Sequence, residues 1–322
     1  MPAEAIALTT RLFFCSDVHG SQVCFQKFLN AAKFYKTQVL ILGGDITGKA
    51  IVPIVRDGNS YSANVLGIPQ TAKGQEELSA LEKSIADVGY YYYVADSRET
   101  EALAADHSRL DRLFTELMIQ RLQSWLDLAS ERLAGTDARC FIMPGNDDRE
   151  EAIRLLDSST YVINPDKRVV DVDSHHEMVS LGYANMTPWK CPRDVTEDRL
   201  MAMIDEMASQ VKDMKNCIFN MHVPAFDSGI DVTTALDKDL KPIMTSSGPQ
   251  QISAGSTSVR SAIEKYHPLL ALHGHIHESR GVAKIGRTMC LNPGSEYSEG
   301  ILRGAVVQLA ETKVKSYLLV SG

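Results

Sequence analysis

Short apolar runs alternate with longer stretches of helical periodicity along most of the chain. Six runs rich in Val, Ile, Leu and Phe end abruptly in polar, glycine-containing turns: LFFCSDVHG, VLILGGD, CFIMPGNDD, MVSLGYAN, CIFNMHVP and LLALHGHIH. Such runs are typical of buried strands. Between many of them, apolar residues recur at helical spacing, around residues 31–35, 110–126, 196–212 and 259–266. The alternation predicts an α/β fold.

Polar side chains gather where these predicted strands end. In five of the six runs, carboxylates, an amide or histidines follow the last apolar residue. Open α/β sheets place their ligand sites at the carboxyl ends of their strands. We therefore expect these side chains to meet in one site.

The regular alternation is interrupted between residues 50 and 105. IVPIV and YSANVLGI, separated by RDGNS, predict a β-hairpin with an Asp-Gly turn. A helix with one apolar face and a run of four tyrosines follow. We expect a single domain, residues 1–322, with a hairpin-plus-helix insertion at about 50–105. This insertion would be a lid over the site or a partner surface, and it would select the substrate.

Composition and charge narrow the class of protein. No apolar stretch approaches the ~20 residues that span a bilayer, and the acidic residue near the start argues against a signal peptide. The net charge of −8 makes nucleic acid an unfavourable partner. The six cysteines form no C-x-x-C pair, which predicts reduced core residues in a cytoplasmic protein. The oligomeric state stays open.

One motif suggests a phosphate-binding P-loop and fails in detail. GGDITGKA matches G-x-x-x-x-G-K behind a predicted strand. However, Ala50 replaces the Ser or Thr that would bind magnesium, and Asp45 would face the phosphate with a negative charge. Pro53 would also prevent the helix that must follow. We therefore reject a nucleotide switch of this type.

A set of seven polar residues is better explained by metal binding. They supply carboxylate oxygens, an amide oxygen and imidazoles: Asp17, His19, Asp45, Asn146, His222, His275 and His277. This donor set suits Mn, Fe, Zn or Co rather than calcium. Seven ligands exceed what one ion ordinarily takes, so we expect two divalent transition-metal ions about 3.5–4 Å apart, bridged by a carboxylate. Each cluster alone is better explained as a turn or a structural residue, and only the set as a whole favours metal binding.

The order of these residues resembles the calcineurin-like metallophosphoesterase family. Its blocks D-x-H, G-D, G-N-[H]-[DE], H and G-H-x-H are matched by DVH, GD, GNDD, MHVP and GHIH, and NPGS resembles a turn that often follows them. The resemblance spans residues 12 to about 295. It implies a four-layer α/β/β/α sandwich of two mixed β-sheets, with the metals at the strand ends.

The resemblance also implies how the ligands are shared. Asp17, His19 and His277 would bind one ion, Asn146, His222 and His275 the other, and Asp45 would bridge both. His273 has no counterpart among the family's ligands, so we expect it to be structural or to orient a ligand. The implied reaction is hydrolysis of a phosphate ester by a metal-bridging hydroxide.

Asp147 departs from the family pattern. The family usually has a histidine in this third place of the block, where it protonates or stabilises the leaving oxygen. Burial near Asp148 would raise the pKa of Asp147 and make it a general acid. Alternatively, Asp147 only caps a helix that begins near Arg149. The sequence leaves both interpretations open.

The expected function is a metal-dependent phosphoric ester hydrolase that acts on a small-molecule phosphoester, with a phosphodiester favoured over a monoester. Lys49, Arg260 and Arg280 are candidates to bind phosphate oxygens, although simple solvation is the favoured interpretation. The alternative function is a non-catalytic binding scaffold on the same fold. A scaffold has no need of seven filled ligand positions, which favours the enzyme.

Overall fold

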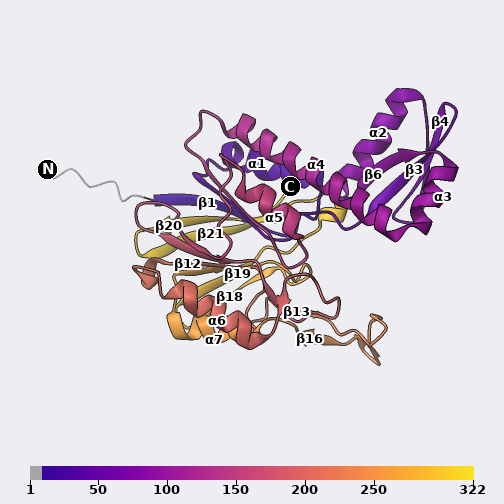
Figure 1. Cartoon of the computed structure of the whole chain (residues 1–322). Coiled ribbons are helices and arrows are strands. Elements are labelled where there is room, and N and C mark those ends of the chain that lie inside the picture. Colours follow the sequence, from indigo (N-terminus) through magenta and orange to yellow (C-terminus); the bar gives the residue numbers. More distant parts are fainter. Residues whose placement is uncertain (1–8) are drawn as a thin grey trace.

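Two β-sheets pack face to face, and helices cover their outer faces (Figure 1). The computed structural model describes residues 9–322, so part of the segment on which the signal-peptide prediction rests lies outside it. The first sheet runs β21 (Lys313–Ser321), β20 (Arg303–Ala310), β1 (Thr9–Cys15), β2 (Val39–Gly43) and β7 (Arg139–Met143). The second runs β18 (Gly281–Ile285), β19 (Thr288–Asn292), β17 (Leu270–Leu272), β12 (Ile218–Met221), β9 (Glu177–Leu181) and β8 (Arg168–Asp171).

The central strands of both sheets are buried on both faces. In β1, Leu12 and Phe14 belong to the core between the two sheets, whereas Phe13 and Cys15 belong to the core under the helices. Successive side chains of a strand point to opposite faces, so a strand between two apolar layers must be apolar throughout. This explains why the sequence shows uninterrupted apolar runs. The predicted α/β/β/α sandwich is confirmed.

The helices form the two outer layers. The first sheet is covered by α1 (Gln22–Phe34), α4 (His107–Leu133) and α5 (Glu150–Asp157), and the second by α6 (Glu197–Ala208) and α7 (Thr257–Tyr266). Phe25 of α1 and the buried Trp125 of α4 stack with ring centroids 4.1 Å apart. All four predicted helical stretches fall within α1, α4, α6 and α7 or overlap them.

Residues 51–105, between β2 and α4, form a unit with a sheet of its own, which projects from one side of the sandwich (Figure 1). It consists of β3 (Ile51–Asp57), β4 (Ser60–Val65), β5 (Ile68–Lys73), α2 (Gly74–Asp87), β6 (Tyr91–Ala95) and α3 (Ser97–Ala105). The predicted hairpin is confirmed, because β3 and β4 pair antiparallel around Gly58. The segment exceeds the expected hairpin and helix, since the tyrosine run forms β6 and pairs with β3.

Short elements complete the described chain. They are β10 (Ala184–Asn185), β11 (Asp194–Val195), β13 (Val232–Thr234), β14 (Met244–Thr245), β15 (Gly248–Pro249), β16 (Gln251–Ser253), η1 (Met214–Asn216) and η2 (Tyr297–Glu299). No helix follows Gly48, because the described chain passes directly into β3, and this agrees with the rejection of a P-loop. All six cysteines are unpaired and five are buried, while Cys191 is partly exposed. Among residues 9–322, no helix is long and apolar enough to cross a membrane.

Candidate metal centre

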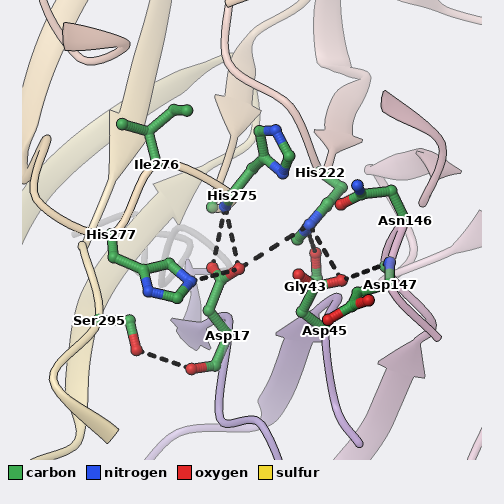
Figure 2. A network of polar contacts seen from close by, with 12 residues as sticks. Asp17, Gly43, Asp45, Asn146, Asp147, His222, His275, Ile276, His277 and Ser295 are labelled. Carbon is green, nitrogen blue, oxygen red and sulfur yellow. Dashed lines mark hydrogen bonds and ion pairs between the residues drawn. The ribbon is translucent and has the colours of Figure 1, made fainter. Parts of the chain in front are cut away.

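The seven predicted ligands converge at the carboxyl ends of strands from both sheets, and Figure 2 labels all of them except His19. Asp17, Asp45 and Asn146 follow β1, β2 and β7, while His222 follows β12 and the last two histidines follow β17. Backbone hydrogen bonds hold the first two loops together. The N–H of Asp17 donates to the carbonyl of Gly44 at 2.9 Å, and that of His19 to the carbonyl of Asp45 at 3.0 Å. The parallel pairing of β1, β2 and β7 therefore places these loops side by side.

Four of the candidate ligands have a left-handed backbone. The φ angles are +57° for Asp17, +39° for His19, +49° for Asp45 and +64° for His275. Residues other than glycine rarely adopt this region, and such residues cluster at active sites and ligand-binding loops. The surrounding strands hold them in this conformation. The strain thus coincides with the residues that the sequence singled out.

Asp17, His19 and His277 form the first cluster, with one ligand atom from each within 4.8 Å of the others. The Nε2 atoms of His19 and His277 lie 3.2 Å apart, and Nε2 of His277 lies 3.5 Å from Oδ1 of Asp17. The backbone N–H of His275 donates to both oxygens of Asp17, which fixes the carboxylate (Figure 2). The three ligand atoms are therefore close enough to share one ion.

Asp45, His222 and His275 form the second cluster. The Nδ1–H of His222 donates to the carbonyl of Gly43 at 2.9 Å, which directs Nε2 toward the carboxylates. Nε2 lies 3.4 Å from Oδ1 of Asp45, whose Oδ2 lies 3.6 Å from Nε2 of His19. Asp45 therefore faces both clusters, as a bridging ligand must.

Burial and charge set the protonation of these groups. Burial lowers the pKa of His19 to about 3 and, together with the charge of His222, that of His275 to about 4. Burial also opposes the charged form of His222, but Asp45 and Asp17 outweigh it and raise this pKa to about 9. Despite burial, the neighbouring imidazoles hold the pKa values of Asp17 and Asp45 below the usual range. At neutral pH the metal-free centre therefore holds two carboxylates, the neutral imidazoles of His19 and His275, and a protonated His222.

Asn146 is oriented by a residue that the sequence analysis missed. Its Nδ2 donates to Oδ1 of Asp194 at 2.8 Å, whereas its own Oδ1 is buried with no hydrogen-bond partner. The amide oxygen is therefore the free ligand atom. Asp194 lies 48 positions further along the chain, and no local pattern marks it.

His273 and the turn after β19 brace the histidine loop. Nδ1 of His273 contacts the carbonyls of Met221 and Val223 at 2.9 and 3.1 Å. Asn292 donates to the carbonyl of Ile276 at 3.0 Å, and Ser295 donates to the carbonyl of Asp17 at 2.7 Å. The structural role expected for His273 agrees with these contacts. The NPGS turn therefore ties the two loops of the first cluster together.

Asp147 does not cap the following helix, so that interpretation is wrong. The N-terminal cap of α5 is Arg149, with no side-chain cap. The carboxylate of Asp147 instead lies 3.3 Å from Nζ of Lys49 and groups with His19 and Asp45. Burial and then the charge of Asp45 raise its pKa, against the opposing charge of Lys49.

Asp148 is not the neighbour that raises the pKa of Asp147. It accepts the N–H groups of Ile46, Thr47 and Gly145 at 2.7–3.0 Å, so its carboxylate joins two loops beneath the site. Asp45 supplies the repulsion instead.

A cavity of about 880 Å³ opens onto the centre. Asp45, Asn146, His275 and His277 lie in its lining, with Lys49 and Arg149 as cationic groups. No residue between 50 and 105 lines it, so the inserted sheet is not a lid over the cavity. Arg260 is occupied elsewhere, because it donates to the carbonyls of Phe226 and Asp227. The walls come from α4, the loop before β11, and the β13–β16 region.

Comparison with known proteins identifies the fold. No protein-family model matches the chain. The uncharacterized protein MJ1162 of Methanocaldococcus jannaschii is 33% identical over 153 residues, which cover 47% of this chain and 62% of that protein. The match thus spans less than two thirds of this relative's length.

Two solved structures match nearly the whole chain. TT1561 of Thermus thermophilus is 13% identical, with a TM-score of 0.52 over 98% of this chain and 99% of that one. A second solved chain is 15% identical, with a TM-score of 0.55 over 97% and 99%. At these identities the likeness shows the fold alone, and the two-sheet sandwich that the motif blocks imply is confirmed.

Proposed function

We propose that this protein is a calcineurin-like metallophosphoesterase that hydrolyses a small-molecule phosphate ester with two divalent transition-metal ions. The main support is the convergence of two groups of ligand atoms, with Asp45 between them. Within each group, the atoms lie within 4.8 Å of one another. We assign Asp17, His19 and His277 to one ion and Asn146, His222 and His275 to the other. A scaffold would not require these strained, buried groups.

The side chains fit metal ions by an independent criterion. Nε2 of His222 and Oδ1 of Asn146 are buried and have no hydrogen-bond partner within the protein. A buried polar atom without a partner costs about 1–3 kcal/mol, so such atoms at one site call for a ligand. The mixed nitrogen and oxygen donors suit Mn, Fe, Zn or Co. The unpaired cysteines support a reducing compartment such as the cytoplasm.

Bound ions would supply a nucleophile from water at neutral pH and neutralise charge on the phosphoryl oxygens. The protein's own groups then orient the substrate and move protons. Lys49 stands beside Asp147 at the cavity and would attract the anionic ester. Asp147, with its raised pKa, would protonate the leaving oxygen. We favour a phosphodiester over a monoester as substrate.

The direct test uses metal-stripped protein and two nitrophenyl substrates, a phosphodiester and the matching monoester. Titration with Mn²⁺, Fe²⁺, Zn²⁺ and Mg²⁺ should restore hydrolysis as two ions bind per chain. The ratio of the two rates assigns the ester class. Two bound ions with no turnover of either ester would favour the scaffold instead.

Metal binding should release protons at neutral pH. In the metal-free protein, His222 has a pKa of about 9 and is protonated at pH 7, yet only neutral imidazole binds a metal. The apparent affinity should therefore fall as the pH drops below about 9, by up to about tenfold per pH unit for this proton. Calorimetric titration with Zn²⁺ in two buffers of different ionisation enthalpy counts the protons. Binding without proton release at pH 7 would contradict the assignment of His222.

Asp147→Asn tests the general acid. Because a poor leaving group needs a proton in the transition state, hydrolysis of an alkyl or phenyl ester should slow by about 100-fold or more. The nitrophenyl ester, with its good leaving group, should change far less. Asp127→Asn, on the exposed side of α4, is the control for loss of a carboxylate. Equal slowing of all esters would remove Asp147 from proton transfer.

A further inference from the structure

Two large apolar side chains stand exposed at the cavity. Trp189 is 61% exposed and Met186 is 55% exposed, and both line the cavity that opens onto the candidate metal centre. Apolar groups exposed together beside a polar centre commonly mark a ligand-binding surface. Neither contributes to a hydrophobic core of the sandwich.

The turn that carries Trp189 is held in place by hydrogen bonds. Oδ2 of Asp194 accepts the backbone N–H groups of Thr187 and Cys191, at 3.0 and 2.9 Å, and the hydroxyl of Thr187 at 2.5 Å. The N–H of Lys190 closes the turn onto the carbonyl of Thr187 at 3.2 Å. An exposed tryptophan on so constrained a turn is preorganised for contact with a ligand.

The same carboxylate connects this turn to the metal centre. Oδ1 of Asp194 accepts from Nδ2 of Asn146, the candidate ligand. Cys191 of the turn and Asp147 both line the same cavity. A group resting on Trp189 would therefore lie beside an ester positioned at the second cluster.

The rest of the lining combines aromatic, cationic and hydroxyl groups. Phe114 and Tyr297 add aromatic surface, Arg149 adds a cation, and Thr233 and Thr234 add hydroxyls. At about 880 Å³, the cavity is within the range of about 300–1,000 Å³ for sites that enclose drug-sized ligands. The hydroxyl of Thr233 donates to Glu278 and that of Thr234 accepts from Gln251, so both already have partners within the protein. A small sugar phosphate would leave Trp189 exposed, whereas a flat ring with polar edges would cover it and meet the polar groups around it.

We propose that Trp189 is the stacking platform for the base of a nucleoside phosphate ester, and that the turn at residues 187–192 selects this substrate class. This inference rests on the proposed phosphoesterase function for its chemistry. Binding of the base to Trp189 can be tested separately, because a ring can stack on the indole whether or not the ester is hydrolysed.

Tryptophan fluorescence provides the binding test. The chain contains two tryptophans, and the other, Trp125, is buried. Adenosine 5′-monophosphate should quench the fluorescence of Trp189, whereas ribose 5-phosphate, which lacks the base, should not. Trp189→Phe should abolish the quenching. Equal quenching by both phosphates, or quenching that survives in Trp189→Phe, would overturn the platform.

The kinetic test compares two diesters with the same nitrophenolate leaving group, thymidine 5′-(4-nitrophenyl) phosphate and methyl 4-nitrophenyl phosphate. Stacking of one base is worth about tenfold in affinity, so the thymidine ester should have a KM about tenfold lower. Trp189→Ala should narrow this difference to less than about twofold. Phe34→Ala is the control, because Phe34 is a highly exposed aromatic residue at the end of α1. It should leave the KM difference between the two diesters unchanged.

The outcomes separate the two proposals. Hydrolysis of both diesters with equal KM overturns the platform and leaves the phosphoesterase function standing. Quenching by adenosine 5′-monophosphate with no hydrolysis of either diester supports the platform and counts against the proposed function. Phenyl 4-nitrophenyl phosphate, in which a phenyl group replaces the methyl group, tests whether any flat ring lowers the KM as much as a nucleoside does. If the phenyl ester gains as much as the thymidine ester, the nucleoside assignment is wrong.

Discussion

Asp45→Asn is expected to lower the rate of nitrophenyl ester hydrolysis by about 1,000-fold or more, because it removes the charge that both metal positions share. The carboxylate lies between Nε2 of His19 and Nε2 of His222, at 3.6 and 3.4 Å. Among the described residues, 9–322, no other carboxylate takes part in two of the potential ligand groups. An amide has one oxygen and no charge, so it cannot bridge two cations in the same way.

The substitution should leave the fold intact. Asparagine has nearly the same shape, and its oxygen can still accept the backbone N–H of Asp147, which lies 3.1 Å from Oδ1 of Asp45. Metal content measured on the purified variant should fall below two ions per chain, while its unfolding transition stays cooperative. Asp127→Asn, on an exposed face, should retain wild-type rate and metal content. Hydrolysis by Asp45→Asn near the wild-type rate would refute the shared-bridge assignment.

The layers of the sandwich could be predicted because burial leaves a local trace. A strand such as β2, covered on both faces, is apolar at every position, and the polar residue that ends it stands out. Strands β4 and β5 of the inserted sheet show no such apolar pattern. Their side chains are mostly exposed or half-exposed and include Ser, Gln and Thr, so the turn at Gly58 is the clearest sequence signal for this hairpin.

The site was predictable where it depends on strand ends and unpredictable where it depends on contacts between distant segments. The seven predicted ligands follow strands, and the topology brings them together without further information. Asp194 and Trp189 lie in a loop whose position depends on a hydrogen bond across 48 residues. For Asp147, adjacency suggested Asp148 as its partner. The structure turns Asp148 toward the backbone of the neighbouring loop, and Asp45 is the negative charge that raises the pKa of Asp147.

Gly274→Ala is expected to disrupt the first cluster because the added methyl group would clash with neighbouring side chains. A Cβ atom at this position would lie 2.1 Å from Oγ of Ser16 and 2.3 Å from Oδ2 of Asp17, far inside van der Waals contact. The backbone cannot move away freely, because the N–H of Gly274 donates to the carbonyl of His222 at 2.9 Å. Relief therefore requires displacement of Asp17 or separation of the β12 and β17 ends.

Either displacement should cost about 1–3 kcal/mol of unfolding free energy and weaken metal binding at the first cluster. Gly67→Ala is the matched control, because its φ of +82° imposes backbone strain while no atom lies within 4 Å of the added Cβ. Denaturant unfolding should show a loss of stability for both variants, because the left-handed alanine of Gly67→Ala costs about 1–2 kcal/mol. Only Gly274→Ala should lose metal and activity. Two ions bound by Gly274→Ala with wild-type affinity would show that Asp17 does not belong to the centre, because its carboxylate cannot keep its place beside the new methyl group.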